Sequence, residues 1–117
     1  MIPNCSELVW IGRSIRDFRD LPQRIQEELG QDLTDVRMGQ MPSNAKPLKG
    51  FGGASVQELT NSDRAGTYRV VYTVRIQDVV CVLHAFQKKS SSGIKTSKQD
   101  MDIIKQRLAQ AEGEYGK

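Results

Sequence analysis

The stretch TYRVVYTVRIQDVVCVLHAFQKK, residues 67–89, decides the fold of this chain. It holds two runs rich in β-branched and aromatic residues, 67–76 and 79–87, separated by Gln77 and Asp78. Residues of these types favour strands, and a short polar break between two such runs is typical of a β-hairpin. The sequence therefore predicts a long antiparallel hairpin.

The register of this hairpin decides which side chains share a face. A two-residue loop places Arg69 opposite Phe86, and Arg69, His84 and Lys88 then line one surface, because residues paired across strands point to the same side. A slip of one residue would bring Lys89 to that surface instead of Lys88 and would move His84 away. Both registers stay open at this point.

Alternate residues of the first hairpin strand form an apolar face. Because successive side chains of a strand point to opposite faces, the even-numbered residues point into the core and Arg69 points away from it. Replacing Arg69 is therefore not expected to disturb the core. The residues of the predicted core face are Tyr68, Val70, Tyr72, Val74 and Ile76.

The segment before the hairpin predicts a strand followed by two helices. Residues 7–12, ELVWIG, form the strand, and residues 14–21 form a short helix. Pro22 suits the first turn of a second helix, where its missing N–H costs nothing. The apolar residues of that helix recur at helical spacing and predict one buried stripe. They are Ile25, Leu29, Leu33 and Val36.

A loop and a further strand precede the hairpin, and a helix follows it. Residues 38–53 are rich in glycine and proline and predict the loop, and residues 55–60 predict the strand. Thr96 and Ser97 are candidates for the N-cap of the last helix. The predicted buried stripe of that helix is Met101, Ile104, Leu108 and Ala111.

Together these elements predict an α+β fold, with the whole chain, residues 1–117, forming one domain. The N-terminal helices are expected to pack on one face of a small, mostly antiparallel sheet, and a C-terminal helix ends the chain. We expect the helices on a single face, so that the opposite, partly polar face carries Arg69.

Positive charge is concentrated in the middle of the chain. Residues 46–98 hold 9 Lys and Arg against 3 Asp and Glu, a net charge of +6, although the whole chain has only +3. The net charge is −2 over residues 1–45 and −1 over residues 99–117. Such a concentration is typical of a surface for phosphates, but a solvated face would have the same composition.

Composition argues against several classes of protein. No apolar run approaches the roughly 20 residues of a transmembrane helix, and no signal peptide is expected. Cys5 and Cys81 form no CxxC pair, and His84 is the only histidine, so neither a disulfide framework nor a metal site is expected. We expect a protein of the reducing cytoplasm that needs no cofactor.

A basic sheet face has the groups that RNA cleavage needs. Attack by a ribose 2′-OH requires a base, cations that stabilise the phosphorane and an acid for the leaving oxygen, and no metal. Arg69, His84 and either Lys88 or Lys89 would supply these groups. The same residues would also serve to bind an RNA backbone without cleaving it.

The hairpin resembles that of the RelE superfamily of toxins, the ribosome-dependent mRNA endonucleases of type II toxin–antitoxin modules. The similarity extends to AKPLKGFGG, YRVVYTVR, LHAFQKKS and GIKTSKQDMDIIKQRL, and the phage-derived, HigB-like branch is the closer match. It implies a RelE-like α+β fold and cleavage of mRNA in the ribosomal A site. It also implies a cognate antitoxin, expected to be a small helix-turn-helix protein through which the complex would bind operator DNA.

The resemblance assigns roles to individual residues. Arg69 matches the arginine that contacts the scissile phosphate in the family. Lys89, with Lys88 just before it, matches a second basic residue at the end of the next strand, which is arginine in RelE. Val56 and Glu58 stand where RelE has two lysines, so that part of the RelE site is missing.

The resemblance leaves the general base open. The base-stacking tyrosine of RelE would fall near Lys95, and His84 comes earlier than the histidine of other branches. The candidates for the base are Glu58, Lys49 and Lys95. The residues expected to bind RNA are Lys46, Lys49, Arg75 and Lys98.

Two alternatives fit the same sequence. A non-catalytic RNA- or ribosome-binding module would use the same basic face, and the missing RelE lysines and tyrosine favour it. A phage-derived protein-interaction domain would explain the resemblance but not the positive middle segment. Growth arrest on induction is expected to separate the enzyme from both.

Overall fold

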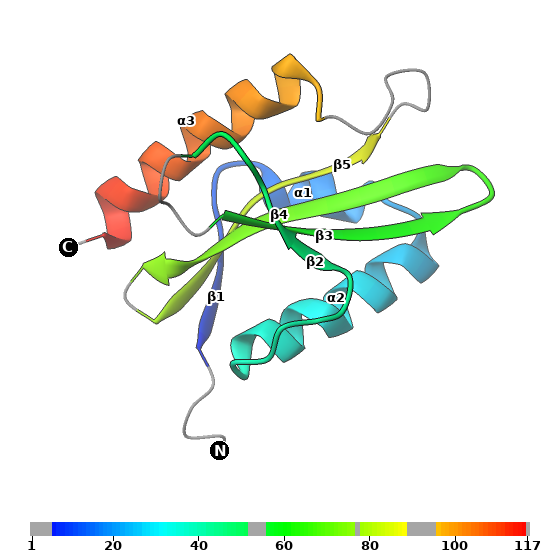
Figure 1. Cartoon of the computed structure of the whole chain (residues 1–117), viewed down its shortest axis with the longest axis horizontal. Coiled ribbons are helices and arrows are strands. Elements are labelled where there is room, and N and C mark those ends of the chain that lie inside the picture. The colour runs from blue at the N-terminus through cyan, green and yellow to red at the C-terminus, as the bar shows by residue number, and fades with distance from the viewer. Residues whose placement is uncertain (1–5, 52–55, 77, 89–95, 117) are drawn as a thin grey trace.

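The computed structural model describes residues 6–51, 56–76, 78–88 and 96–116. A β-sheet forms its middle layer, with α3 on one side and α2 on the other (Figure 1). The elements in chain order are β1 Glu7–Trp10, α1 Ser14–Arg19, α2 Gln23–Arg37, β2 Ala45–Pro47, β3 Val56–Asp63, β4 Gly66–Ile76, β5 Val79–Lys88 and α3 Lys98–Tyr115.

The five strands are arranged in the order β1-β5-β4-β3-β2. The pairs β2–β3, β3–β4 and β4–β5 are antiparallel, whereas β1 runs parallel to β5. The predicted α+β fold with a mostly antiparallel sheet is thereby confirmed. The predicted hairpin is also confirmed, as β4 and β5.

The register of the hairpin agrees with that of a two-residue loop at the positions of interest. Arg69 lies opposite Phe86, and Val71 lies opposite His84. An irregularity follows between Val71 and Tyr72, and the pairing beyond it is shifted. Arg69, His84 and Lys88 therefore share one face of the sheet, as the simple register predicts.

One face of the sheet is covered by α1 and α2. The stripe predicted for α2 is buried there, and Leu29 is fully buried. This stripe packs against Tyr68, Val70 and Tyr72 of β4, which are buried. Val74, predicted on the same core face, is exposed. The cluster consists of Phe18, Leu21, Ile25, Leu29, Leu33, Val36, Leu59, Tyr68, Val70, Tyr72, Val80, Val82 and Ala85.

The opposite face is covered by α3, so the expectation that the helices lie on a single face is wrong. The physical reason is that this face also carries apolar side chains: Val71 and Leu83 are fully buried there, and they need a cover. Ile104 and Ala111 of α3 supply it. The cluster consists of Ile11, Val56, Val71, Cys81, Leu83, Ile104 and Ala111.

Two further features belong to the α3 side of the sheet: the N-terminus of α3 and a short edge strand. Ser97 is the N-cap of α3, and its Oγ accepts a hydrogen bond from the Asp100 backbone N–H at 3.1 Å. Residues 45–47 were predicted within a loop, but they form β2 at the edge of the sheet. Pro47 has no backbone N–H to donate, and proline is tolerated in an edge strand for that reason. Within the described residues, no helix is both long and apolar enough to cross a membrane.

Candidate active site

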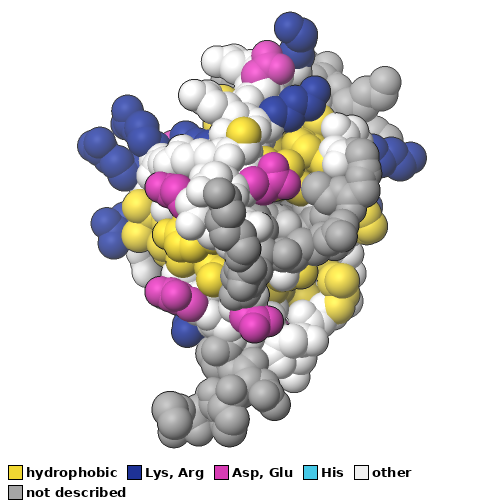
Figure 2. Space-filling view, turned by 90° about the vertical axis from the view of Figure 1, so that its left-hand side faces the viewer, with side chains coloured by type: hydrophobic (Ala, Val, Ile, Leu, Met, Phe, Trp, Pro, Cys, Tyr) yellow, Lys and Arg dark blue, Asp and Glu magenta, His cyan; other side chains and the backbone are white. Residues whose placement is uncertain are grey.

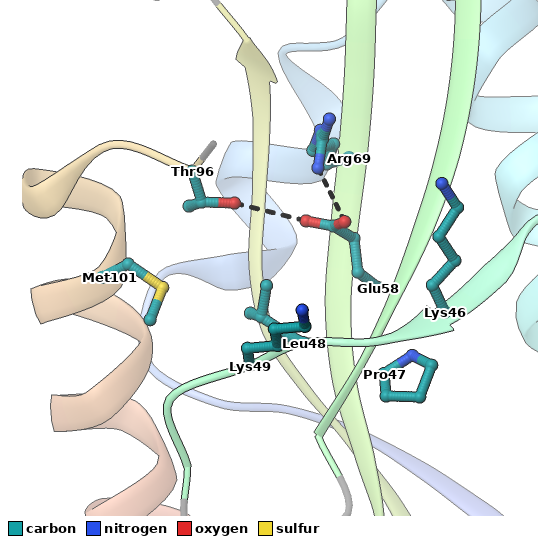
Figure 3. A pocket seen from close by; sticks show the side chains of 8 residues that line it. All are labelled: Lys46, Pro47, Leu48, Lys49, Glu58, Arg69, Thr96 and Met101. Atoms are coloured by element: carbon teal, nitrogen blue, oxygen red, sulfur yellow. Dashed lines mark hydrogen bonds and ion pairs between the residues drawn. The ribbon is translucent and has the colours of Figure 1, made fainter. Parts of the chain in front are cut away.

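A pocket of about 600 Å³ opens on the α3 side of the sheet (Figure 3). It lies between the first turn of α3, the segment around β2, and the middle of β3 and β4. The residues that line it are Lys46, Pro47, Leu48, Lys49, Glu58, Arg69, Thr96 and Met101. The pocket therefore brings together four of the candidate residues: Glu58, Arg69, Lys46 and Lys49.

An ion pair between Glu58 and Arg69 forms the floor of the pocket. Glu58 pairs with Val71 across β3 and β4, so Glu58 and Arg69 are diagonal neighbours on one face. Arg69 Nη1 donates to Glu58 Oε1 at 2.6 Å, and the two side chains are only 13% and 7% exposed. Removing Arg69 would leave the apolar core filled but a buried carboxylate without this partner, so its replacement is expected to destabilise the fold.

The second oxygen of Glu58 is also held in place. Thr96 Oγ1, just before α3, donates to Glu58 Oε2 at 3.4 Å. The carboxylate is thus fixed in orientation by one strand neighbour and by the start of the last helix (Figure 3). A carboxylate that is fixed and charge-paired at the wall of a pocket can accept a proton from a bound hydroxyl group.

Lys88 is a buried cation close to this pair. It is 8% exposed, and its Nζ has no hydrogen-bond partner within the part of the chain that the structure describes. Burial and, next, the positive charge of Arg69 lower the pKa of Lys88, while the negative charge of Glu58 acts in the opposite direction. A lysine with a lowered pKa gives up its proton more readily than an ordinary one.

His84 lies in a different polar cluster, beside the pocket and not in its lining. Its Nε2 is 2.8 Å from Asp100 Oδ1, and its Nδ1 is 3.6 Å from Asp17 Oδ2. Arg107 donates to Asp17 at 2.9 Å and to the Leu83 carbonyl at 3.0 Å. These contacts tie α1, β5 and α3 together, and they place His84 as a support of the site.

The remaining candidates are distributed as follows. Lys46 and Lys49 lie on the rim of the pocket, and their side chains are exposed. Lys98 is also exposed and forms an i,i+4 ion pair with Asp102 at 3.9 Å. Lys89, Lys95 and the side chain of Arg75 lie outside the described residues.

Sequence reasoning missed part of the lining. Thr96 was expected only as a helix cap, and Met101 only as a member of the apolar stripe of α3. Spacing alone does not reveal that the first turn of α3 faces β3 and β4. The available signal was the position of both residues directly after the basic segment, which brings the helix start to the basic face.

The positive charge of the pocket is not typical of the whole surface. Figure 2 shows a face on which Lys and Arg side chains are interspersed with Asp and Glu around apolar patches. That mixed surface contrasts with the pocket, where three cations face one carboxylate. Among the residues that the structure describes, no group of three or more His, Cys, Asp and Glu could hold a metal ion.

The fold is similar to solved structures of toxins. A mutant of E. coli toxin RelE in the free state has a TM-score of 0.55 and 19% identity, covering 91% of this chain and 97% of that chain. The intact E. coli RelBE toxin–antitoxin complex has a TM-score of 0.52 and 24% identity, covering 72% of this chain and 98% of that chain. The isolated E. coli RelE toxin has a TM-score of 0.51 and 22% identity, covering 86% of this chain and 97% of that chain. At these identities the similarity shows the fold, which is RelE-like as the sequence indicated.

Sequence comparison adds the family. No curated protein sequence is significantly similar to this one. The sequence profile of the family described as phage-derived protein Gp49-like matches residues 16–109, which is most of the chain. The match includes β2 to β5 and the first turns of α3, from which the pocket is built. The chain therefore belongs to the phage-derived Gp49-like family, and its fold is that of the RelE superfamily.

Proposed function

We propose that this protein is the toxin of a type II toxin–antitoxin module and that it cleaves mRNA on the ribosome. The RelE-like fold supports the class, since the similar structures described above are of a toxin, alone or with its antitoxin. The observation that carries the proposal is the Glu58–Arg69 ion pair in a pocket rimmed by lysines. This arrangement has the groups for attack of a 2′-OH on the adjacent phosphate.

Glu58 is the general base in this proposal. Of the three candidates for the base, Glu58 is a carboxylate held at the pocket wall with both oxygens hydrogen-bonded, while the side chain of Lys49 is exposed on the rim. A carboxylate accepts the 2′-OH proton at neutral pH, when an ordinary lysine is already protonated. This assignment also explains why Glu58 occupies a position at which RelE has lysine.

Arg69 binds the scissile phosphate and stabilises the phosphorane. A guanidinium has five N–H donors in a planar fork, so contact with Glu58 through Nη1 is compatible with contact to a phosphate oxygen. Charge-assisted hydrogen bonds to the phosphate strengthen as charge accumulates in the transition state. Arg69 therefore serves both to hold Glu58 and to bind substrate.

Lys88 is the acid for the leaving 5′-oxygen. Its ammonium group is buried near Arg69, and its pKa is lowered for that reason. A general acid works best when its pKa is near the working pH, so the shift is in the useful direction. Lys46 and Lys49 then bind flanking phosphates. RNA affinity that rests on such contacts falls as the salt concentration rises.

The partners follow from the same proposal. The protein acts in the cytoplasm on ribosome-bound mRNA and is held inactive by a cognate antitoxin, a small helix-turn-helix protein. An acidic segment of that antitoxin would be attracted to the cationic pocket. Operator DNA would be bound through the antitoxin.

Induction of the protein in bacteria without an antitoxin tests this function. We expect growth arrest, with mRNA cut within reading frames during translation. Arg69→Ala, compared at equal levels of soluble, folded protein, should abolish the arrest, since loss of one such transition-state donor costs about 10²–10³ in rate. Arg24→Ala is the matched control, because Arg24 is paired with Glu28 on the exposed side of α2 and should leave the arrest unchanged.

Two outcomes would reject the proposal. Normal growth and intact transcripts at good soluble expression would exclude a toxin. Growth slowed in proportion to ribosome occupancy, without cleavage, would favour the non-catalytic binding module. The second outcome is separated from the first by co-sedimentation of the protein with ribosomes.

A further inference from the structure

The pocket has an apolar wall as well as a charged one. Pro47, the last residue of β2, and Leu48, which follows it, contribute to this wall, and Met101 reaches in from the first turn of α3 (Figure 3). Glu58 and Arg69 supply the charged part of the same lining. None of the described lining residues is aromatic. The lining is thus aliphatic in one part and charged in another, which suits a bound molecule with one apolar and one polar end.

Met101 is held in this position by its neighbours. Gly50 has a φ of +100°, a conformation that favours glycine, and a Cβ built on it would lie 3.2 Å from Met101 Cε, so the methionine methyl group packs close to the Gly50 backbone. The preceding residue, Asp100, is bound by His84 at 2.8 Å and by the cap of α3 at Ser97. The start of α3 is therefore fixed, and with it the backbone position from which the Met101 side chain enters the pocket.

We propose that the wall of Pro47, Leu48 and Met101 binds the base of the nucleotide whose phosphate contacts Arg69. The proposal rests on the proposed function for the identity of the ligand, an RNA nucleotide. Its phosphate end is matched by Arg69, Lys46 and Lys49, and the flat apolar face of its base is matched by the aliphatic wall. The pocket volume of about 600 Å³ is within the range of roughly 300–1,000 Å³ typical of small-ligand sites.

Methionine is suited to this role in a particular way. Its thioether makes favourable contacts with aromatic rings and its unbranched side chain adapts to different shapes. A base held by Met101 is therefore bound through its face, without hydrogen bonds to its edge. We expect purines to bind more tightly than pyrimidines because of their larger faces, with little selection between adenine and guanine.

Methyl NMR of the full chain tests the contact directly. The chain has 4 methionines, and Met38 and Met41 are exposed and outside the pocket lining, so their methyl signals serve as internal references. The protein is titrated with adenosine 3′-monophosphate, with ribose 5-phosphate and with inorganic phosphate. We expect the Met101 methyl signal to move upfield with the nucleotide, through the ring current of the base, and to stay in place with the two ligands that lack a base.

Substitution gives the second arm of the test. Met101→Ala should weaken adenosine 3′-monophosphate up to about tenfold, the upper end of what a sulfur–aromatic contact contributes, and should leave phosphate affinity unchanged. Met101→Leu, which keeps the apolar bulk but not the sulfur, should restore part of the loss. Met41→Ala is the matched control and should change neither affinity.

The outcomes separate this inference from the proposed function. An unmoved Met101 signal, an equal response to ribose 5-phosphate, or unchanged nucleotide affinity in Met101→Ala would overturn the base-binding wall even if the protein cleaves mRNA. Nucleotide binding at Met101 in a protein that does not cleave would support the wall and reject the nuclease. Loss of binding to all three ligands in Met101→Ala would show general damage to the pocket and would also overturn the assignment to the base.

Discussion

The two faces of the sheet differ in how completely they are covered. The face under α1 and α2 is sealed by apolar side chains, and Ile25, Leu29 and Val70 are fully buried there. The face under α3 is apolar towards the C-terminal end of that helix, but near its first turn it holds Glu58 and Arg69. Burying a charged pair costs desolvation free energy that its mutual attraction only partly offsets, so this part of the face is expected to contribute less to stability than the sealed face.

The first prediction concerns the sealed face. Leu29→Ala should lower the free energy of unfolding by about 2–5 kcal/mol, because it removes apolar contacts and leaves a cavity in a close-packed cluster. Urea denaturation measures this loss. The exposed Met41 supplies the control, since Met41→Ala removes a side chain with little packing. Equal losses of stability in Leu29→Ala and Met41→Ala would contradict the description of this face as sealed by close packing.

The second prediction concerns the ion pair on the other face. Arg69→Ala should lower the free energy of unfolding by about 3 kcal/mol, the lower end of the range for breaking a buried pair from one side. The double variant Glu58→Ala/Arg69→Ala should be more stable than Arg69→Ala alone, because no unpaired carboxylate remains. If the loss of stability in the double variant equals the sum of the losses in Glu58→Ala and Arg69→Ala, the two side chains are not electrostatically coupled.

The third prediction concerns the start of α3, on which the pocket depends. Ser97→Ala should cost about 1 kcal/mol, since the Ser97 Oγ accepts the Asp100 backbone N–H at 3.1 Å as an N-cap. Amide hydrogen exchange should show the loss as faster exchange in the first turn of the helix. Unchanged protection there would mean that the His84–Asp100 contact alone fixes the helix start.

The smallest effect is expected from the buried lysine. Because the pKa of Lys88 is lowered from its ordinary value of 10.5, the unfolded state binds more protons than the folded state between the two pKa values. Stability should therefore rise with pH through that window, by the linkage between proton binding and folding. Lys88→Met should remove this rise and should raise the melting temperature slightly at neutral pH.

Thermal unfolding between neutral and alkaline pH checks this prediction. Lys105→Met serves as the control, because Lys105 is exposed on α3. If wild type and Lys88→Met show parallel pH dependences, Lys88 does not carry a shifted pKa, and its role as an acid loses its basis.

The sequence predicted the sealed face well, and the physical reason is periodicity. The 4-, 4- and 3-residue spacing of Ile25, Leu29, Leu33 and Val36 can form only one helical stripe, and all four are buried. The alternation along β4 likewise identified Tyr68, Val70 and Tyr72. The apolar residue Val71 on the other side of β4 already required a second cover, which the expectation of helices on one face overlooked.

The polar face was harder to predict, because contacts between distant segments build it. Residues 58 and 69 could be placed as neighbours only once the pairing of β3 with β4 was known, and Thr96 reaches Glu58 across 38 positions of sequence. Residue types identified Arg69 as a candidate, and the resemblance to RelE toxins added Glu58. They did not reveal the ion pair, or that His84 belongs to a supporting cluster beside the pocket.

The central claim is that the polar part of the α3 face is catalytic, with Glu58 as the base. Single-turnover cleavage of mRNA on programmed ribosomes, with ribosome binding measured separately, tests it most directly in Glu58→Gln. The amide keeps the size of the side chain and an acceptor for Arg69 but is a far weaker base. Glu28→Gln, which makes the same change on the exposed side of α2, is the control. We expect cleavage by Glu58→Gln to fall by about 10²–10⁴ with binding and folding retained, and Glu28→Gln to cleave as wild type does. Cleavage at the wild-type rate by a folded Glu58→Gln protein would contradict the account.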